Sequence, residues 1–502
     1  MLLIGIDAGN SEMKATYADA TGAPQLVRNQ RGESHTPSVV YFPASGEPIV
    51  GTEALNMAAA EPERVVQNWK RSMGTDEVLY RDEAGVEYGA KDILYILLKD
   101  VKANARAQLG EDPTECVITV PANYNDRQKQ ETREAAERAG MKVIIMPHEP
   151  TAAALGNGFH LRSNGRALVY DLGGGTFDVS VVQNRGNVFE ILATNGEPHL
   201  GGQDFNKRIE ENVLEQFEKE HKYRPMPAAD PLFFQELRER IESSKISLSV
   251  KNEANLVVRC DSRLLNMRIT RADVESSTKD LLGITIERSL KTVQDAGITE
   301  AEIDEVYPVG GSSLMPMVRQ ALEKTFGNKV VQKCEPHYAA ALGAILAARV
   351  EYARCGKQFF VGGVALPHPN ILLREVTTYS IGVSVENDNN QVVFYEMIPK
   401  RTPIPSTHVK RFKLAKPNQT AALIEVLQGE EGQPRDKAVR LGQFDLTDLP
   451  ARAEMTERIE IEFTLDSSGV LTAIARDMES GRTAQLAIEY KKNNNDKQGN
   501  GK

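Results

Sequence analysis

The chain has 502 residues and a mass of 55.4 kDa, which at about 150 residues per domain predicts roughly three domains. Hydrophobic residues make up 41% and charged residues 26% of the chain, a globular composition that excludes wholesale disorder. The net charge of −10 argues against a nucleic-acid partner, because such proteins usually carry a basic patch. The four cysteines have no CxxC pair, which disfavours a disulfide framework or a zinc site and fits a reducing compartment.

The N-terminal segment MLLIGIDAGN has neither a charged leader region nor a cleavage site, so it is not typical of a signal peptide. The sequence has no run of 18 apolar residues that could cross a bilayer. We therefore expect a cytoplasmic protein that acts without a membrane.

Residues 1 to about 350 alternate short apolar strands with amphipathic helices, which predicts an α/β domain. Strands are expected at 2–7 and 167–171. Helices are expected at 125–140, with a polar cap at its start and a glycine at its end, and at about 272–296 from its 3.6-residue period.

Residues 356–370 are rich in glycine and proline and read as a domain boundary. The apolar triplet 371–373 is either an anchor or the first strand of the next domain. After it the helical pattern disappears: 459–465 alternates apolar and polar residues, a turn follows, and 470–476 resumes the alternation. Several such strands predict a β-sandwich. We expect the polar tail to be disordered.

The first motif with chemical meaning joins a strand to a tight turn. The strand ends at Asp7, and Gly9, Asn10 and Ser11 follow. Such a turn can point backbone N–H groups at a phosphate, although the motif alone is as typical of an ordinary hairpin.

A second copy of this plan changes the balance. Asp171 ends another strand, and three glycines (173–175) and Thr176 follow. Consecutive glycines cost backbone entropy, so they indicate a need for conformational freedom or close approach. Two such loops predict a clamp on one phosphate chain, with the two aspartates holding Mg²⁺ through its waters. A third glycine motif, Val309-Gly310-Gly311-Ser312-Ser313, could let a flat base approach, while the P-loop and dinucleotide fingerprints are absent.

The order of these motifs resembles the seventy-kilodalton heat-shock chaperone family. The matching segments are GIDAGN, VITVPANYND, HEPTAAALG, DLGGGTFDVS, LATNGEPHLGGQDF and VGGSS, followed after residue 370 by ILLREVTTYSIGV, PIPSTHVKRF, LIEVLQGE and LGQFDL. The resemblance covers about 2–490, with weaker matches at 75–112 and 215–262.

The resemblance implies an α/β, actin-like, two-lobed nucleotide-binding domain at 1–355, an interdomain linker at 356–375, an all-β sandwich that binds peptides at 376–490, and a disordered tail at 491–502. Family members continue into a helical lid, whereas only 13 residues follow Glu489 here. We therefore expect no lid, fast peptide exchange and low peptide affinity.

The resemblance also assigns roles to single residues. The metal-organising carboxylates are Asp7 and Asp171. The catalytic residues are Lys70, Glu149, Asp171 and Thr176. The nucleotide-binding residues are Gly9, Asn10, Ser11, Glu12, Gly173, Gly174, Gly175, Gly201, Gly202, Glu242, Lys245, Ser249, Gly310, Gly311 and Ser312. The peptide-binding residues are Val383, Phe412, Ala415, Ala422, Ile424 and Ile459. Without the resemblance, Lys70 would read as a solvated surface charge, and the apolar strand residues as core.

Several positions depart from the family pattern. Asn10 replaces a threonine beside the γ-phosphate, so we expect hydrolysis to suffer more than binding. Leu314 and His337 replace an arginine and an acidic residue near the adenine site, which predicts weaker nucleotide affinity. Ile145 stands where bacterial members carry an arginine that J-domain partners use. Glu386 replaces an apolar residue of the arch over the peptide channel, and Ala422 replaces a larger apolar residue at its pocket, which predicts a preference for bulkier or basic side chains.

The sequence thus predicts a chaperone-like ATPase that binds ATP or ADP with Mg²⁺, hydrolyses ATP slowly and binds extended hydrophobic peptides. J-domain co-chaperones and a nucleotide exchange factor are the partners that the resemblance implies, and Ile145 argues against the first. A second hypothesis is a nucleotide-gated scaffold that binds one dedicated protein partner with negligible hydrolysis. A sugar or glycerol kinase is a third, and it has no need of the 371–490 sandwich.

Overall fold

The computed structural model describes residues 2–58, 60–159, 164–186, 188–377, 379–387, 389, 391–466 and 469–486. The chain divides into two compact units. The first unit comprises residues up to 124 and 131–374, and the second comprises 125–130 and the residues from 375 onward. The polar tail expected at 491–502 lies outside the described residues.

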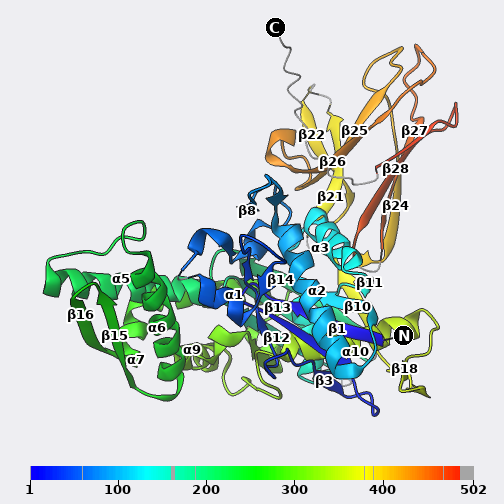
Figure 1. The fold of residues 1–502 in the computed structure, drawn as a ribbon. Helices are drawn as coiled ribbons and strands as arrows, with labels where there is room; N and C mark the ends of the chain where they lie inside the picture. Colours follow the sequence, from blue (N-terminus) through cyan, green and yellow to red (C-terminus); the bar gives the residue numbers. More distant parts are fainter. Residues whose placement is uncertain are drawn as a thin grey trace, which may run out of the picture. The chain divides into compact units, whose positions relative to one another are not determined.

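Two sheets of the first unit repeat one topology (Figure 1). In each, three consecutive strands form an antiparallel meander, and the first of them also pairs in parallel with a later strand. The first sheet has the order β11-β10-β1-β2-β3: Lys142–Ile145, Pro113–Thr119, Leu2–Ala8, Glu12–Ala18 and Pro24–Leu26. In the second, β17-β12-β13-β14-β20, the strands are Glu305–Val309, Asn164–Leu172, Phe177–Arg185, Val188–Glu197 and Leu372–Val376. The structure confirms the expected strands at 2–7 and 167–171.

Two helices of small residues cross between the sheets. α4 (Glu149–Gly156) and α10 (Ala339–Arg354) approach so closely that a Cβ at Gly343 would overlap the Ala152 carbonyl. Only glycine allows two backbones to approach this closely. The remaining helices are α1 (Thr52–Met57), α2 (Ala90–Leu109), α3 (Asp126–Arg138), α5 (Gly202–His221), α6 (Pro231–Val250), α7 (Arg271–Ser277), α8 (Lys279–Asp295) and α9 (Pro316–Phe326).

The helix expected at about 272–296 is in fact two helices, α7 and α8, which meet at Thr278. Thr278 has φ −118°, outside the helical range, and its hydroxyl donates to the Val274 carbonyl at 2.7 Å. A β-branched residue that uses its side chain in this way favours a helix end over a helix interior. The expected helix at 125–140 is confirmed as α3, which Asn125 caps by accepting from the Gln128 amide at 3.0 Å.

A separate lobe of the first unit lies at the left of Figure 1 and consists of α5, α6, α7 and a hairpin of β15 (Glu253–Cys260) and β16 (Arg263–Thr270). It has its own apolar core, which includes Phe217 and Leu237. Among its described residues, the first half of the unit also contains the short strands β4 (Thr36–Pro37), β5 (Val40–Tyr41), β6 (Ile49–Val50), β7 (Val65–Val66), β8 (Tyr80–Arg81) and β9 (Glu87–Tyr88).

Residues 356–374 fold onto the first unit. They form a small hairpin of β18 (Phe360–Val361) and β19 (Val364–Ala365), and Phe359 and Leu366 are buried in the core that contains Leu3. The apolar triplet then enters β20, where Leu372 and Leu373 pair in parallel with β14.

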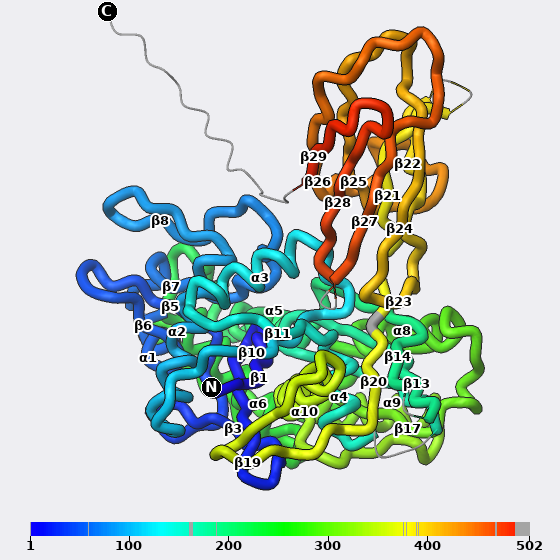
Figure 2. The backbone as a smooth tube through the Cα atoms, turned by 90° about the vertical axis from the view of Figure 1, so that its right-hand side faces the viewer, coloured from blue at the N-terminus to red at the C-terminus, as the bar shows by residue number. Residues whose placement is uncertain are grey.

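The second unit is a sandwich of two four-stranded antiparallel sheets (Figure 2). One has the order β22-β21-β25-β26: Val392–Ile398, Ser380–Glu386, Ala422–Gly429 and Val439–Leu446. The other, β24-β27-β28-β29, comprises Ser406–Phe412, Ile459–Leu465, Leu471–Asp477 and Thr483–Leu486, and β23 is Pro403–Ile404. β27 alternates buried and half-buried residues along its length and pairs with β28, as the sequence predicts.

An α/β unit followed by an all-β sandwich is the architecture that the sequence predicts. Within the described residues, no helix is both long and apolar enough to cross a bilayer.

Candidate functional site

The two Asp-glycine motifs form equivalent loops at the ends of equivalent strand pairs. In the first loop the Gly9 amide donates to the Glu12 carbonyl at 3.1 Å, and in the second the Gly173 amide donates to the Thr176 carbonyl at the same distance. The two aspartates also occupy equivalent places. Asp7 lies on the first strand of its pair just before the loop, and Asp171 does the same in the second pair. The repeat predicted from the sequence is therefore a repeat of structure.

The two loops face each other at contact distance. A Cβ at Gly174 would overlap the Ser11 hydroxyl, and one at Gly175 would lie 2.5 Å from the Asn10 amide nitrogen. A side chain at either glycine would require the Ser11 or Asn10 side chain to shift. Backbone N–H groups from two opposed loops are an arrangement suited to a phosphate chain.

The predicted catalytic lysine and glutamate form a buried ion pair. Lys70, in the short 3₁₀ helix η2 (Trp69–Ser72), places its Nζ 2.8 Å from Oε1 of Glu149 at the start of α4. Each side chain is 10% exposed. Burial raises the pKa of Glu149, and the Lys70 charge opposes this rise. Burial alone would lower the pKa of Lys70, but the charges of Glu149 and Asp7 keep it above its usual value. The surface-charge interpretation of Lys70 is therefore wrong.

The two aspartates join this pair in one electrostatic cluster. Burial, followed by the charges of Glu149 and Asp178, holds the pKa of Asp171 well above its usual value. Asp7 accepts a hydrogen bond from the Thr119 hydroxyl at 3.3 Å. Burial raises the pKa of Asp178 to about 7, against a hydrogen bond with the Thr176 side chain. Carboxyls crowded in this way favour a bound cation.

The donor set fits a hydrated Mg²⁺ better than a metal held directly by the protein. Among the described residues, no three His, Cys, Asp or Glu side chains form a metal-binding group. Asp178 nevertheless leaves a buried carboxylate oxygen, Oδ1, without a hydrogen-bond partner. Mg²⁺ retains several waters and needs few direct carboxylates, so Asp7 and Asp171 could hold it through those waters.

The predicted adenosine-side residues also come together, on the second half of the unit. At the start of α5, a Cβ at Gly201 would lie 2.6 Å from the Gly175 amide, and one at Gly202 would overlap the Ser312 hydroxyl. Lys245 on α6 donates to Glu242 at 2.8 Å and to the Gly202 carbonyl at 3.4 Å.

The third glycine motif reaches the same place from β17. Gly310 has φ +80°, and a Cβ there would lie 2.7 Å from Oδ1 of Asp171. A Cβ at Gly311 would lie 2.7 Å from the ring of His337, a residue whose pKa burial lowers. The left-handed backbone and the close approach together require glycine at 310.

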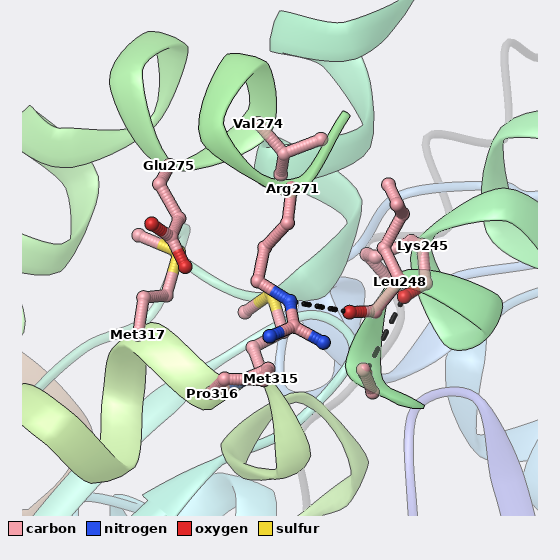
Figure 3. A pocket seen from close by; sticks show the side chains of 9 residues that line it. Lys245, Leu248, Arg271, Val274, Glu275, Met315, Pro316 and Met317 are labelled. Carbon is pink, nitrogen blue, oxygen red and sulfur yellow. Dashed lines mark hydrogen bonds between the residues drawn. The ribbon is translucent and has the colours of Figure 1, made fainter. Parts of the chain in front are cut away.

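A pocket of about 270 Å³ opens beside this group (Figure 3). Its mainly apolar wall includes Leu248, Val274 and Met315, and the predicted residues Lys245 and Ser249 also line it. The Arg271 guanidinium crosses the pocket and is fixed by a 2.9 Å hydrogen bond from its Nε to the Leu248 carbonyl.

Sequence reasoning missed a set of polar residues that connect the two loops. Asn68, at φ 60°, accepts hydrogen bonds from the Asn10 amide at 3.1 Å and from Gln203 at 2.5 Å. Arg71 donates to the Gly175 carbonyl and, at 3.2 Å, to Asp204. Asn68 and Arg71 lie close to Lys70 in the sequence, and Gln203 follows Gly202, so their positions could have marked them as candidates. Their convergence, however, depends on the fold.

Lys14 and Asp178 were missed as well, although their spacing marks them. Lys14 follows Asp7 at the distance at which Asp178 follows Asp171. Each is the cross-strand partner of its aspartate. Burial alone would lower the pKa of Lys14, but Asp7 and Glu12 hold it above its usual value.

The predicted peptide-lining residues lie in or against the core of the second unit. Val383, Ile424 and Ile459 are buried there, and Phe412 and Ala422 pack against the same cluster. Ala415 is exposed. The structure thus brings five of the six into one cluster, where core packing accounts for the three buried ones.

Two positions that depart from the family pattern have opposite environments. Ile145 is buried on β11 in the core of the first sheet. Glu386 is exposed at the end of β21.

Two equivalent Asp-glycine loops beside a buried cluster of carboxylates, in an α/β unit followed by a β-sandwich, are typical of the class of nucleotide-binding proteins with an appended β domain. The Hsp70 protein family model matches residues 3–500. The chain therefore belongs to the Hsp70 family, whose members are ATP-binding chaperones with ATPase activity. Family members generally bind ATP or ADP with Mg²⁺, and also unfolded peptides and co-chaperones.

Proposed function

We propose that this protein is an ATP-dependent chaperone in which the first unit binds ATP with Mg²⁺ and hydrolyses it slowly. The nucleotide state in turn controls how the second unit binds extended hydrophobic segments of unfolded proteins. Family membership supports the class of activity. The observation that carries the proposal is the buried Lys70–Glu149 pair, 2.8 Å apart, in one electrostatic cluster with Asp7 and Asp171.

Each part of the cluster has a task in phosphoryl transfer, which needs positioning and charge stabilisation. The backbone N–H groups of the loops at 9–12 and 173–176 bind the phosphates. Asp7 and Asp171 hold the waters of Mg²⁺, which supplies charge neutralisation when bound. Glu149 fixes the Lys70 ammonium, which orients the attacking water and donates to the terminal phosphate. The apolar pocket beside Lys245 and Ser249 takes the base.

The second unit is proposed to hold peptide by strand-like main-chain hydrogen bonds, with an apolar pocket for one central side chain. Phe412 and Ala422 are the candidates for this pocket, because they are only half-buried against the core. Ile145 is buried, which argues against a charged contact with a J-domain partner at that position.

Coupling between the units is proposed to run through β20. Leu372, Leu373 and Arg374 pair with β14 in the first unit, and the strand then continues into the second. A nucleotide that favours one pairing state changes peptide affinity by no more than its own differential affinity for the two states.

A nucleotide-gated scaffold is the second candidate function, and one observation favours it. The amide of Asn10, which stands where the family has a threonine, is bound to Asn68 at 3.1 Å. A side chain engaged in this way is a poor participant in hydrolysis, whereas nucleotide binding does not require it to be free.

Single-turnover hydrolysis of Mg·ATP, with and without an extended hydrophobic peptide, tests both candidates. We expect slow hydrolysis that peptide accelerates, and Lys70→Ala should reduce it by about a hundredfold. Lys91→Ala is the matched control, because Lys91 forms a 2.8 Å ion pair with Glu134 on the protein surface. Tight ATP binding with no hydrolysis above the Lys70→Ala background and no peptide response would contradict the chaperone proposal and support the scaffold.

A further inference from the structure

Lys14 is a buried cation at the first phosphate loop. It lies on β2 directly opposite Asp7 on β1, one residue pair inside the loop. Residues opposite each other in an antiparallel pair project to the same face. The Lys14 ammonium is 3.1 Å from Glu12 and 3.9 Å from Asp7, and its side chain is 10% exposed.

This ammonium has more hydrogen-bonding capacity than its neighbours use. An ammonium carries three N–H donors, and within the described part of the chain Glu12 supplies the one carboxylate oxygen at hydrogen-bonding distance. Lysine is rarely buried without full pairing, because removing its charge from water is costly. An additional anionic partner would therefore be favourable.

The second loop differs in the charge of the residue at the equivalent position on its returning strand. At the position equivalent to Lys14 it carries Asp178. Asp178 lies opposite Asp171 in the strand register, as Lys14 lies opposite Asp7. Lys14 and Asp178 thus place opposite charges at equivalent positions next to the two loops. The lysine is therefore not a general requirement of this kind of strand pair.

We propose that Lys14 is a phosphate-binding residue, whose ammonium donates to the phosphate chain of a nucleoside di- or triphosphate held between the two loops. The inference rests on the proposed nucleotide site and deepens it. Lys14 supplies a positive charge from within the protein in addition to the divalent cation. Diphosphate binding should therefore persist in part without Mg²⁺ and depend on Lys14 most strongly under that condition.

Isothermal titration of the full-length protein with ADP and with adenosine tests this, each with Mg²⁺ and with excess EDTA. We expect Lys14→Met to weaken ADP binding in EDTA by about tenfold or more, as for loss of a charged hydrogen bond, and to weaken it less with Mg²⁺. Adenosine affinity should not change, and Lys14→Arg should retain most of the ADP affinity. Lys102→Met is the matched control, because the Lys102 side chain on α2 is 19% exposed and its ammonium contacts Asp112 at 3.7 Å and the Gly140 carbonyl at 3.0 Å, neither of which belongs to the two loops.

Three results would overturn the inference while leaving the nucleotide site intact: unchanged ADP affinity in Lys14→Met, equal loss for ADP and adenosine, or tighter ADP binding. Absence of ADP binding by the unaltered protein with Mg²⁺ would instead refute the proposed function as well. Should Lys14→Met fail to fold, Lys14→Gln combined with Glu12→Gln removes both charges of the 3.1 Å ion pair and leaves Asp7 with its hydrogen bond from Thr119. Comparison with Glu12→Gln alone then isolates Lys14, with the same expected loss of ADP affinity.

Discussion

Asp178 is a carboxyl group whose protonation should change near neutral pH. It is 3% exposed, and burial raises its pKa to about 7 from an ordinary value of 3.8. The folded state therefore binds this proton more tightly than the unfolded state, so the group favours folding at low pH. Its contribution is fully present below pH 4 and is lost as pH rises toward 7.

We expect Asp178→Asn to remove this pH dependence. In the absence of nucleotide and Mg²⁺, the variant should be no more stable than the unaltered protein at pH 4.5 and should gain relative stability up to pH 8. A shift of about three pKa units sets an upper bound of about 4 kcal/mol on the gain. Denaturant unfolding at several pH values measures the difference, and a gain that is constant with pH would contradict the assignment.

The loops, as elements, depend on close backbone approach. The start of α5 packs against the second glycine loop at Gly201, where a Cβ would lie 2.6 Å from the Gly175 amide and 2.7 Å from the Gly174 carbonyl carbon. Backbone atoms cannot move aside as a flexible side chain can. The geometry of the second loop therefore requires that residue 201 have no Cβ.

We expect Gly201→Ala to displace the second loop and to weaken ADP binding by at least about tenfold. Gly283→Ala is the matched control, because a Cβ at Gly283 in α8 would meet nothing within 4 Å. Alanine in a helix interior should stabilise the protein by about 0.5–1 kcal/mol and leave ADP affinity unchanged. Equal ADP affinity in the two variants would show that the close approach at Gly201 has no role in the site.

For the whole molecule, two compact units with separate cores predict two unfolding transitions. The sandwich has its own apolar cluster, whereas the candidate nucleotide residues all belong to the first unit. Saturating Mg·ADP should therefore raise the transition of the first unit, by about 2.7 kcal/mol at one hundred times Kd. Scanning calorimetry of the full chain should show the other transition unmoved. A single unfolding transition whose temperature rises with Mg·ADP would mean that the two units unfold together.

Local patterns in the sequence are sufficient for the loops and for the sandwich. The strand–Asp–glycine plan, repeated at Asp7 and Asp171, predicts two equivalent turns, because turn geometry depends on neighbouring residues. The alternation in 459–465 likewise predicts a half-buried strand, since the side-chain period of a strand is two.

Positions whose meaning depends on distant neighbours could not be predicted in the same way. Glycine and proline at 356–370 indicate a linker, yet Phe359 and Leu366 are buried in the core of the first unit. A propensity for turns does not predict whether two apolar side chains are buried in a core. Likewise, the helix expected at 272–296 is divided into two helices because Thr278 leaves the helical backbone.

The sequence alone thus determined the two equivalent Asp-glycine loops, the α/β and all-β organisation and, through the resemblance, the family. Only the tertiary structure decided which charges share the site: Lys70 with Glu149, and Lys14 with Asp7. The reason is physical. Turns and strand periods are set by residues adjacent in the chain, whereas burial and ion pairing depend on what folding brings near, and it is burial that makes these charges chemically useful.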